Sequence, residues 1–539
     1  MQTPPPDWVS LGAQKTQGLD LLGLRAPVQA VGNHLLNGLT SVTPKIRYLS
    51  VLAWIAWHYA EGRLPAARSS FIEFASAQEA AIVMANLLND RKNKKTTLSL
   101  VGVGNARIKL DSKGAYLSLE PLVNIIAFLI YASAGVQLRL IFEDEQSGIY
   151  GLTTERGEPL AKAFENIVGQ TDYGRLLTNN RGVARVRRNL IEDLGGRISL
   201  DKIPAKEKRI LIDAVFPISP TQPEERRRLA TFALLLWLSA KKNVPLEEEH
   251  LFEAARRPPR DIPSVFESTL DGWLDYSILD VLAVAHEAVM GAVLAEVDTR
   301  CVNGTPRASS SDVIAALLGK TEDHDEALTD VGLLSDGESI RDKSFPEMLT
   351  RVEQACGERQ TFGNGLRRWR GKLSERLVCR VALGFGPGAA ALLPVAWCLA
   401  VTRLSDGTTS PANLRKVAGR GQFQRIGIRD VVMPKVQEFS AKGASYMEVM
   451  AEMIDRTVQQ HLRVAWQRLS AQGQDVSVLV ADMEGWSRNN QFNAGQSESR
   501  LGVAIGWLRQ LDLIEETGIT KGGQAILDRA LVTLAQVPA

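Results

Sequence analysis

The chain has 539 residues, and its 63 Lys and Arg residues nearly balance its 61 Asp and Glu residues, which gives a formal net charge of +2. Apolar residues make up 45% and charged residues 23%, which excludes a wholly disordered or collagen-like chain. The near-neutral charge excludes a protein that coats nucleic acid by bulk electrostatics, so any nucleic-acid binding must depend on local basic patches.

The sequence carries no pattern typical of export or membrane insertion. The first residues, MQTPPPDW, lack a basic segment followed by an apolar one, so no signal peptide is expected. The apolar runs at residues 229–240 and 389–401 are shorter than the roughly 20 residues that span a bilayer. The four cysteines form no CxxC pair and are too few for a disulfide framework. We therefore expect a cytoplasmic protein with no membrane partner.

Most of the predicted elements are helices. Apolar residues recur at helical spacing in residues 46–60, 78–88, 121–132, 224–240, 278–295, 447–469 and 500–511. Looser alternation predicts short strands at residues 97–103, 106–110 and 115–119, which would form a small antiparallel sheet, and a further strand at 136–143. The predicted fold class is mainly α with minor β, in a multi-domain helical protein.

Two segments share the pattern of the second half of a winged-helix domain. Residues 121–166 and 499–530 each predict a helix, a short strand, a turn with glycine and threonine, and a closing helix. A β-hairpin packed on helices would give the same pattern. Some winged-helix domains bind DNA, whereas others bind only a partner protein. These winged-helix-like segments therefore do not decide the function.

Four regions are expected along the chain. They are an N-terminal helical domain at 1–170 with a small β-hairpin and a winged-helix-like end, a basic helical region at 171–260, a central helical domain at 261–440, and a C-terminal helical, winged-helix-like domain at 441–539. The acidic stretch at 320–342 is expected to be a solvated loop rather than a metal site. Its adjacent Asp323, His324 and Asp325 do not present three ligands on one face.

The sequence contains none of the common catalytic or cofactor motifs. It has no G-x-x-x-x-G-K-[ST] loop for a nucleotide, no H-E-x-x-H zinc motif and no G-x-S-x-G nucleophile motif. The glycine-rich VGVGN at 101–105 lies in a strand pattern with no helix predicted after it, which argues against a dinucleotide site. We therefore expect no cofactor and no metal.

The region from Gly18 to Gly62 holds the densest set of side chains suited to binding or chemistry. Thr43 is placed to cap a helix that begins at Pro44. One interpretation of the region is an aromatic core with a capped helix, and the other is a pocket for a base turned out of DNA. In the second, Asp20 is the catalytic carboxylate, the base is bound by Asn33, His34, Tyr48, Trp54 and Trp57, and phosphates are bound by Arg25 and Arg47.

The same region resembles the opening of a group of large prokaryotic proteins associated with phage-defence loci. The matching residues are Gly18-Leu19-Asp20, Leu22-Gly23, Leu35-Leu36, Gly38-Leu39, Val42-Thr43, Arg47-Tyr48 and Trp54, within less than a tenth of the chain. The resemblance implies a defence role, and a similarity in kind to phage-defence DNA glycosylases would imply excision of modified phage bases. It supplies no catalytic motif, so the assignment of Asp20 rests on the residues alone.

Arginine-rich patches supply further candidates for DNA binding. Arginine binds phosphate with two hydrogen bonds, and aromatic side chains among basic ones suit a groove that follows a nucleic-acid backbone. Solvated helix faces are the alternative interpretation. The candidates are Arg181, Arg185 and Arg188 at helical spacing, Arg367, Arg368 and Arg370 around Trp369, and Arg420 and Arg425 around Phe423.

Three functional hypotheses follow. The first is a DNA-binding antiviral protein, in its most specific form a metal-free DNA glycosylase that excises modified bases from phage DNA. The alternative is a non-enzymatic winged-helix subunit that binds DNA or acts as a scaffold, with other proteins of a defence locus as partners. A transcriptional regulator, which would bind as a dimer to paired half-sites, is a third.

Overall fold

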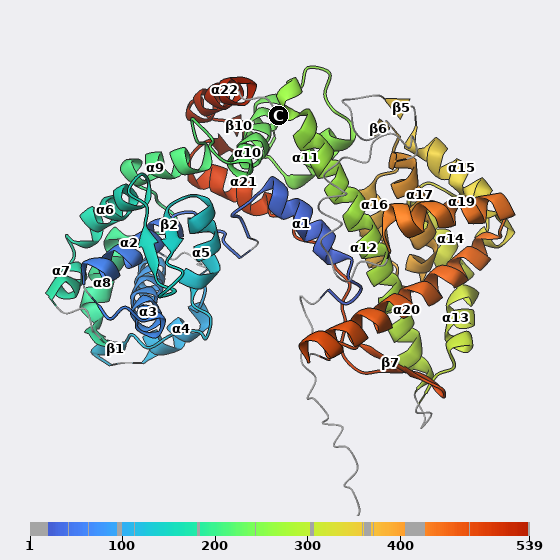
Figure 1. Ribbon diagram of the computed structural model, residues 1–539, viewed down its shortest axis with the longest axis horizontal. Coiled ribbons are helices and arrows are strands. Elements are labelled where there is room, and N and C mark those ends of the chain that lie inside the picture. Colours follow the sequence, from blue (N-terminus) through green and yellow to red (C-terminus); the bar gives the residue numbers. More distant parts are fainter. Residues whose placement is uncertain are drawn as a thin grey trace, which may run out of the picture. The chain divides into compact units, whose positions relative to one another are not determined.

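The computed structural model confirms a mainly helical, multi-domain fold with small antiparallel sheets (Figure 1). The chain forms two compact units, each built from three separate stretches. Unit 1 comprises Met1–Gly32, Phe252–Ile262 and Leu270–Ser497, and unit 2 comprises Asn33–Leu251, Pro263–Thr269 and Glu498–Ala539. The division into four consecutive regions at 1–170, 171–260, 261–440 and 441–539, expected from the sequence, stays a prediction. The structure describes residues 20–40, 42–62, 64–93, 100–112, 114–179, 184–242, 244–301, 307–357, 359–360, 368–369, 371–404, 426–473 and 475–536.

Unit 2 holds most of the helices of the first half of the chain and the last two. Its helices are α2 (Tyr48–Glu61), α3 (Arg68–Lys92), α4 (Val103–Asp111), α5 (Ala127–Gln137), α6 (Gly157–Val168), α7 (Asp172–Asn179), α8 (Arg188–Arg197), α9 (Ala205–Val215), α10 (Pro223–Lys241), the short η1 (Ser264–Phe266), α21 (Leu501–Gln510) and α22 (Lys521–Gln536). Three antiparallel pairs join β1 (Tyr116–Ser118) to β4 (Arg185–Arg187), β2 (Ile141–Glu143) to β3 (Tyr150–Leu152), and β9 (Ile514–Glu515) to β10 (Gly518–Ile519). In its core, α3 packs on α8, α2 on α6, and α10 on α22.

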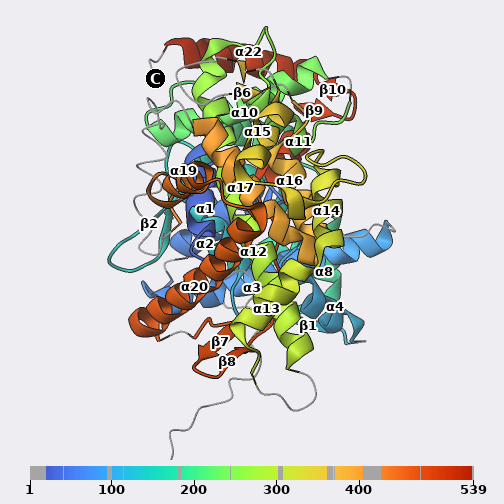
Figure 2. The ribbon, with the colours of Figure 1, turned by 90° about the vertical axis from the view of Figure 1, so that its right-hand side faces the viewer.

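Unit 1 is built around the long helix α12. Its elements are α13 (Ser310–Gly319), α14 (Thr321–Asp330), η2 (Ile340–Asp342), α15 (Phe345–Cys356), β5 (Arg359–Gln360), β6 (Arg368–Trp369), α16 (Glu375–Gly384), η3 (Gly386–Gly388), α17 (Ala389–Leu404), η4 (Ile428–Val432), α19 (Met433–Lys442), α20 (Tyr446–Gln472), β7 (Leu479–Asp482) and β8 (Gly485–Arg488). The helices α1 (Arg25–Leu35), α11 (Glu248–Arg256) and α12 (Glu267–Arg300) contain residues of both units. Helix α20 packs on α13 and α17 and runs across the face of unit 1 shown in Figure 2.

Local signals set the ends of α20. The Ser445 hydroxyl accepts the backbone N–H of Glu448, and the Glu448 carboxylate accepts the N–H of Ser445, which forms a capping box at the first turn. The helix ends at Gly473, whose φ of 65° lies in the left-handed region that glycine adopts without strain.

Among the described residues, two helices are long and apolar enough to cross a membrane by length and composition alone. They are α3 and the continuous helical stretch Ser264–Arg300. Most of the apolar window of each is buried inside the protein, as the core helices of a globular domain are.

The helix–hairpin–helix order expected for residues 121–166 and 499–530 is confirmed, as α5–β2–β3–α6 and α21–β9–β10–α22. Strand β2, at Ile141–Glu143, starts later than the strand expected at 136–143, because residues 136 and 137 still belong to α5. Each hairpin is preceded by a residue with left-handed backbone geometry, Arg139 at φ 56° and Asp512 at φ 55°. The chain therefore reverses direction between helix and strand in the same way in both segments.

The closing helix of each segment begins with the same threonine–glycine contact. The Thr153 hydroxyl accepts the N–H of Gly157 at 3.0 Å. The Thr520 hydroxyl accepts the N–H of Gly523, also at 3.0 Å. A Cβ at either glycine would lie 1.9 or 2.0 Å from a backbone carbonyl oxygen, so only glycine permits this close approach.

Two strand predictions are wrong, and one pairing differs from the expected one. Residues 106–110 lie in helix α4, which starts after Gly102, a left-handed glycine at φ 81°. The strand expected at 97–103 does not form over residues 100–103, and residues 97–99 lie outside the described part of the chain. The strand at 115–119 exists as β1, but its partner is β4 rather than a neighbouring strand. Pairing across such a separation leaves no local signal in the sequence.

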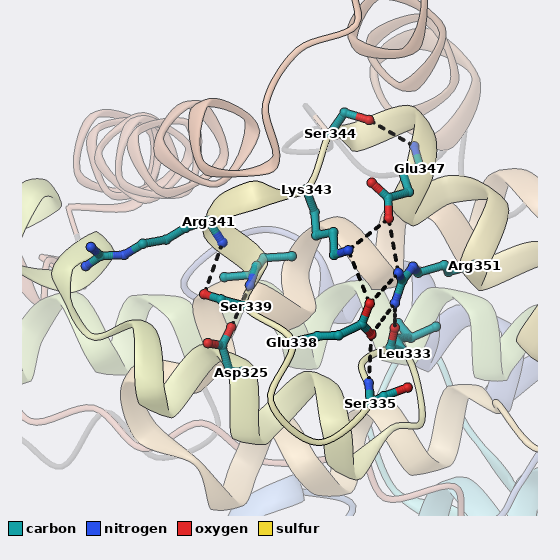
Figure 3. Close-up of polar contacts among 11 residues, drawn as sticks. Asp325, Leu333, Ser335, Glu338, Ser339, Arg341, Lys343, Ser344, Glu347 and Arg351 are labelled. Carbon is teal, nitrogen blue, oxygen red and sulfur yellow. Dashed lines mark hydrogen bonds and ion pairs between the residues drawn. The ribbon is translucent and has the colours of Figure 1, made fainter.

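The acidic stretch at 320–342 is not a solvated loop, because it contains α14 and η2. The turn between them is held by ion pairs, which Figure 3 shows. Arg351 donates to the two Glu338 oxygens at 2.7 and 2.8 Å, and Lys343 donates to Glu338 at 3.2 Å. The bonds from Arg351 and from the Ser335 N–H hold the pKa of Glu338 well below its usual range. Glu338 therefore serves local structure.

Candidate functional site

Asp20, the predicted catalytic carboxylate, caps helix α1. Its Oδ1 accepts the N–H of Leu24 at 2.9 Å, and its Oδ2 accepts the N–H groups of Arg25 at 3.0 Å and Ala26 at 2.8 Å. These amides belong to the first turn of a helix, where N–H groups have no partner within the helix and where a negative charge is favourable. Both carboxylate oxygens are therefore engaged in holding the start of α1.

We expect Asp20→Ala to loosen the start of α1 by about 1 kcal/mol, the usual cost of losing a helix cap. Hydrogen exchange of the α1 amides should then be about fivefold faster, since 1 kcal/mol corresponds to that factor. Asp336→Ala is the matched control, because Asp336 is an exposed carboxylate of the same unit with no side-chain bond to any described residue. Unchanged exchange of α1 in Asp20→Ala would contradict the capping role.

Arg25, assigned to a phosphate, lies between two buried carboxylates. Its Nε and Nη2 each donate to a Glu287 oxygen at 2.6 Å, and its Nη1 lies 3.7 Å from Asp280. The same Nη1 donates to the Ser497 hydroxyl at 2.6 Å. Burial raises the pKa of both carboxyls, and the guanidinium opposes that shift. A phosphate would have to displace these partners, so Arg25 is committed to the interior of unit 1.

Arg47, the second predicted phosphate ligand, forms a buried ion pair with Glu207. Its Nε and Nη2 donate to the two carboxylate oxygens at 3.1 and 2.8 Å. The arginine is 1% exposed and the glutamate 0% exposed. The carbonyls of Ser199 and Lys202 accept the remaining guanidinium bonds. The side chain is thus satisfied inside the core of unit 2.

Helix α2 begins at Tyr48, so the predicted cap by Thr43 at Pro44 is wrong. The Thr43 hydroxyl instead donates to the carbonyl of Thr40 at 2.8 Å. The Gln510 side chain binds the backbone of the turn before the helix. It accepts the N–H of Ile46 at 3.1 Å and donates to the Pro44 carbonyl at 2.7 Å.

Tyr48, predicted to bind a base, is buried beside Glu79. Its hydroxyl donates to the Glu79 carboxylate, which also accepts the N–H groups of Ala127, at 2.9 Å, and Phe128. Glu79 therefore caps α5, and burial raises its pKa to about 7. The Tyr48 ring packs 4.5 Å from the ring of Tyr131, measured between centroids. No face of Tyr48 is open to a base.

Trp54 and Trp57 share a helix but not an environment. Trp54 is 0% exposed, and its indole N–H donates to Glu165 at 2.7 Å. His58 contacts the same carboxylate oxygen through Nε2 at 2.9 Å. Trp57 is half-buried and meets His58 edge-on at 4.9 Å between centroids. This arrangement agrees with the aromatic-core interpretation. Glu165 is more than a hundred residues away in sequence, and nothing in the sequence pointed to it.

Asn33 and His34 lie at the last turns of α1. Asn33 is exposed, and its side-chain oxygen accepts a hydrogen bond from Arg500. The backbone carbonyl of His34 accepts from Arg227 at 3.1 Å. Asp20 belongs to unit 1, whereas Asn33, His34 and the α2 residues belong to unit 2, so the predicted pocket residues do not lie within a single unit.

The arginine patches are only partly described. Arg181, Arg367, Arg370, Arg420 and Arg425 lie outside the described residues, and of Arg368 only the backbone, in strand β6, is described. The predicted helical face of Arg181, Arg185 and Arg188 is wrong, because Arg185 belongs to strand β4 and Arg188 begins helix α8. Arg188 donates to the carbonyls of Leu110 at 2.9 Å and Ser112 at 2.6 Å, so it anchors the chain locally.

The two-stranded ribbon of β1 and β4 presents an exposed basic and aromatic face. Leu117 and Val186 pair across the strands and point into the core, which leaves Tyr116, Arg185 and Arg187 on the outer face. Tyr116 is 55% exposed, and its hydroxyl accepts from Arg187 Nε at 3.3 Å. Neither arginine forms an ion pair with any residue that the structure describes.

Tyr116 was not predicted as a binding residue, and Arg187 was part of an arginine-rich patch but was not singled out within it. The signal was present, because Tyr-Leu-Ser and Arg-Val-Arg each place one apolar residue between two polar or aromatic ones, as a strand with one buried face does. The two tripeptides become one surface only through the β1–β4 pairing, which the sequence did not indicate.

Within the described residues, no three His, Cys, Asp or Glu side chains gather as a metal site requires. No protein-family model, no curated protein and no solved structure matches the chain.

Proposed function

We propose that the protein binds DNA without altering it chemically, through the outer face of the β1–β4 ribbon, as a cytoplasmic subunit of a phage-defence complex. The DNA-binding part rests on one observation: Tyr116, Arg185 and Arg187 share an exposed face and the two arginines have no carboxylate partner among the described residues. The defence setting rests on the resemblance of the region around Asp20 and Trp54.

The face suits a nucleic-acid backbone for chemical reasons. The two guanidinium groups are on one strand with Val186 between them, so both project from the same side of the ribbon. Guanidinium groups bind phosphate oxygens with paired hydrogen bonds, and an exposed tyrosine ring can stack on an unpaired base. The anchoring of Arg188 to two carbonyls fixes the strand end that carries Arg187.

Binding is favoured over base excision because the residues proposed for excision have structural roles. Asp20 caps a helix through three backbone N–H groups, and Tyr48 and Trp54 are buried with their polar atoms bonded to Glu79 and Glu165. Excision requires an accessible carboxylate and an open pocket for the base.

The winged-helix-like segments are not proposed as the DNA-reading elements. In a winged helix the helix before the hairpin enters the groove of DNA. Here α21 buries Leu501, Ala504, Ile505, Trp507 and Leu508, and the Trp507 indole donates to the Thr43 carbonyl at 2.9 Å. That helix is used for packing within unit 2.

The proposal predicts that Arg185→Gln with Arg187→Gln weakens DNA binding about tenfold at physiological salt. Fluorescence anisotropy with a duplex of about 20 base pairs, repeated between about 50 and 200 mM salt, should also show the slope of log K against log salt reduced by about 2. Each phosphate contact releases about one condensed cation from the DNA when the protein binds. Losing two contacts therefore makes the slope smaller.

The matched control is Arg175→Gln with Arg197→Gln. These arginines are exposed in the same unit but are paired with Asp172 and Asp193, so the change in charge is identical. An equal loss of DNA affinity in both double variants would mean that the net charge of the protein, rather than a specific site, determines binding. Alkali treatment of the incubated duplex should reveal no abasic sites, and strand breaks there would instead support excision.

A further inference from the structure

We infer that the groove between α9 and α22 in unit 2 is the docking site for an amphipathic helix of a partner protein, with an apolar face flanked by acidic residues. The inference goes beyond DNA binding and concerns a different set of side chains.

The groove has an apolar floor supplied by two helices and the turn after α9. Its volume is about 400 Å³. Ile212 comes from α9, Ile526 from α22, and Ile218 from the segment that leads to α10. Ile218 is 61% exposed, which is unusual for a side chain of its size beside other isoleucines. An apolar trough of this kind loses its contact with water when a complementary apolar face covers it.

The rim of the groove is mainly basic. Lys208, Arg209 and Arg529 line it, together with one acidic residue, Asp213. Lys208 pairs with Asp512, and Arg529 pairs with Asp213 at 3.4 Å, so two of the three charges are balanced within the unit. Arg209 is exposed and forms no ion pair with any described residue.

A second cation extends this rim along α9. Lys206 is exposed and lies three residues before Arg209, which places both on one face of the helix. The rim therefore carries net positive charge beside an apolar floor.

An acidic amphipathic helix matches both features. A helix docked in a groove presents apolar side chains at positions i, i+3 or i+4, and i+7, and α9, with 11 residues, offers a wall of about three turns for such a face. Glutamates or aspartates beside that face would meet Lys206 and Arg209. DNA would contact the basic rim but leave Ile212, Ile218 and Ile526 uncovered, so a protein helix uses more of the surface.

The test uses two synthetic, fluorescein-labelled peptides of about 15 residues with the full-length protein. Both carry leucines at i, i+3, i+4 and i+7, and one has glutamates on the flanks where the other has lysines. At about 50 mM salt the acidic peptide should bind at least tenfold more tightly than its basic twin, and the difference should shrink as salt is added.

Two surface substitutions locate the site. Ile218→Ser and Arg209→Glu should each weaken binding of the acidic peptide about fivefold, because one removes apolar contact and the other reverses a rim charge. Val244→Ser and Arg107→Glu are the controls, since they change an exposed valine and an exposed arginine of unit 2 that do not line the groove.

Three results would overturn the inference: no binding of the acidic peptide, equal binding of the basic twin, or full affinity in Ile218→Ser. Loss of duplex binding in Arg209→Glu with unchanged peptide binding would assign the groove to DNA instead. The Arg185→Gln, Arg187→Gln variant should bind the peptide normally, so failure of the DNA proposal and failure of this one give different patterns.

Discussion

Glu207→Ala is expected to destabilise unit 2 by about 3–5 kcal/mol, because it leaves the Arg47 guanidinium charged and buried without its carboxylate. The two side chains are almost completely excluded from water and share two hydrogen bonds. Removing one member of a buried ion pair lowers the free energy of unfolding far more than replacing both members with apolar residues does. The reason is that the remaining ion stays buried and has lost its compensating charge.

Urea unfolding followed by circular dichroism measures the effect, with Arg47→Met combined with Glu207→Leu as the test of its cause. The double replacement should regain most of the loss, because it removes both charges and keeps the volume. Glu143→Ala is the control, since its partner Arg68 is half exposed and such a surface pair contributes about 1 kcal/mol or less. If Glu207→Ala costs no more than Glu143→Ala, the buried pair does not carry the stability assigned to it.

Trp54→Ala is expected to cost about 3–5 kcal/mol, the usual range for deleting a fully buried aromatic side chain. The cavity would lie where Trp54 now packs 5.7 Å from the Phe164 ring, measured between centroids. Glu165 would also lose its indole donor and keep His58.

Trp54→Leu separates the structural role from a base-binding role. A leucine has no aromatic face for a base but keeps part of the apolar packing, so this variant should recover part of the stability lost in Trp54→Ala while DNA binding stays unchanged. Stacking on a base contributes about 1–3 kcal/mol per base, so a stacking platform would instead show weaker DNA binding with little change in stability. Fluorescence anisotropy with a single-stranded and a duplex DNA probe, together with urea unfolding of both variants, distinguishes the structural role from the base-binding role.

Local patterns predicted the helices at 46–60, 224–240, 278–295 and 447–469 and both helix–hairpin–helix segments, because helical periodicity and turn residues act over a few positions. The partners of Asp20 are also local, the N–H groups of Leu24, Arg25 and Ala26. Asp20 stands five residues before Arg25, where α1 begins, rather than directly before the helix, so the usual pattern of a helix cap did not mark its role in the sequence.

Pairings between distant residues were not readable. Arg25 meets Glu287, and Arg47 meets Glu207, at separations of 262 and 160 residues. An arginine with a buried carboxylate partner and an arginine free to bind phosphate look alike in a sequence, since the difference is set by tertiary packing. For the same reason the β1–β4 ribbon, whose strands are separated in the sequence by helices α5, α6 and α7, became visible only in the structure.

The interleaved stretches of the two units have a consequence for synthesis on the ribosome. Unit 2 needs Glu498–Ala539, which supplies α22 against α10 and the Trp507 indole bonded to the Thr43 carbonyl. At roughly 5–20 residues per second, Asn33–Leu251 must wait roughly 10–50 s for that last stretch. During that interval the apolar faces that α21 and α22 will cover remain open. The nascent protein therefore exposes apolar surface for longer than a chain whose units follow one another in order.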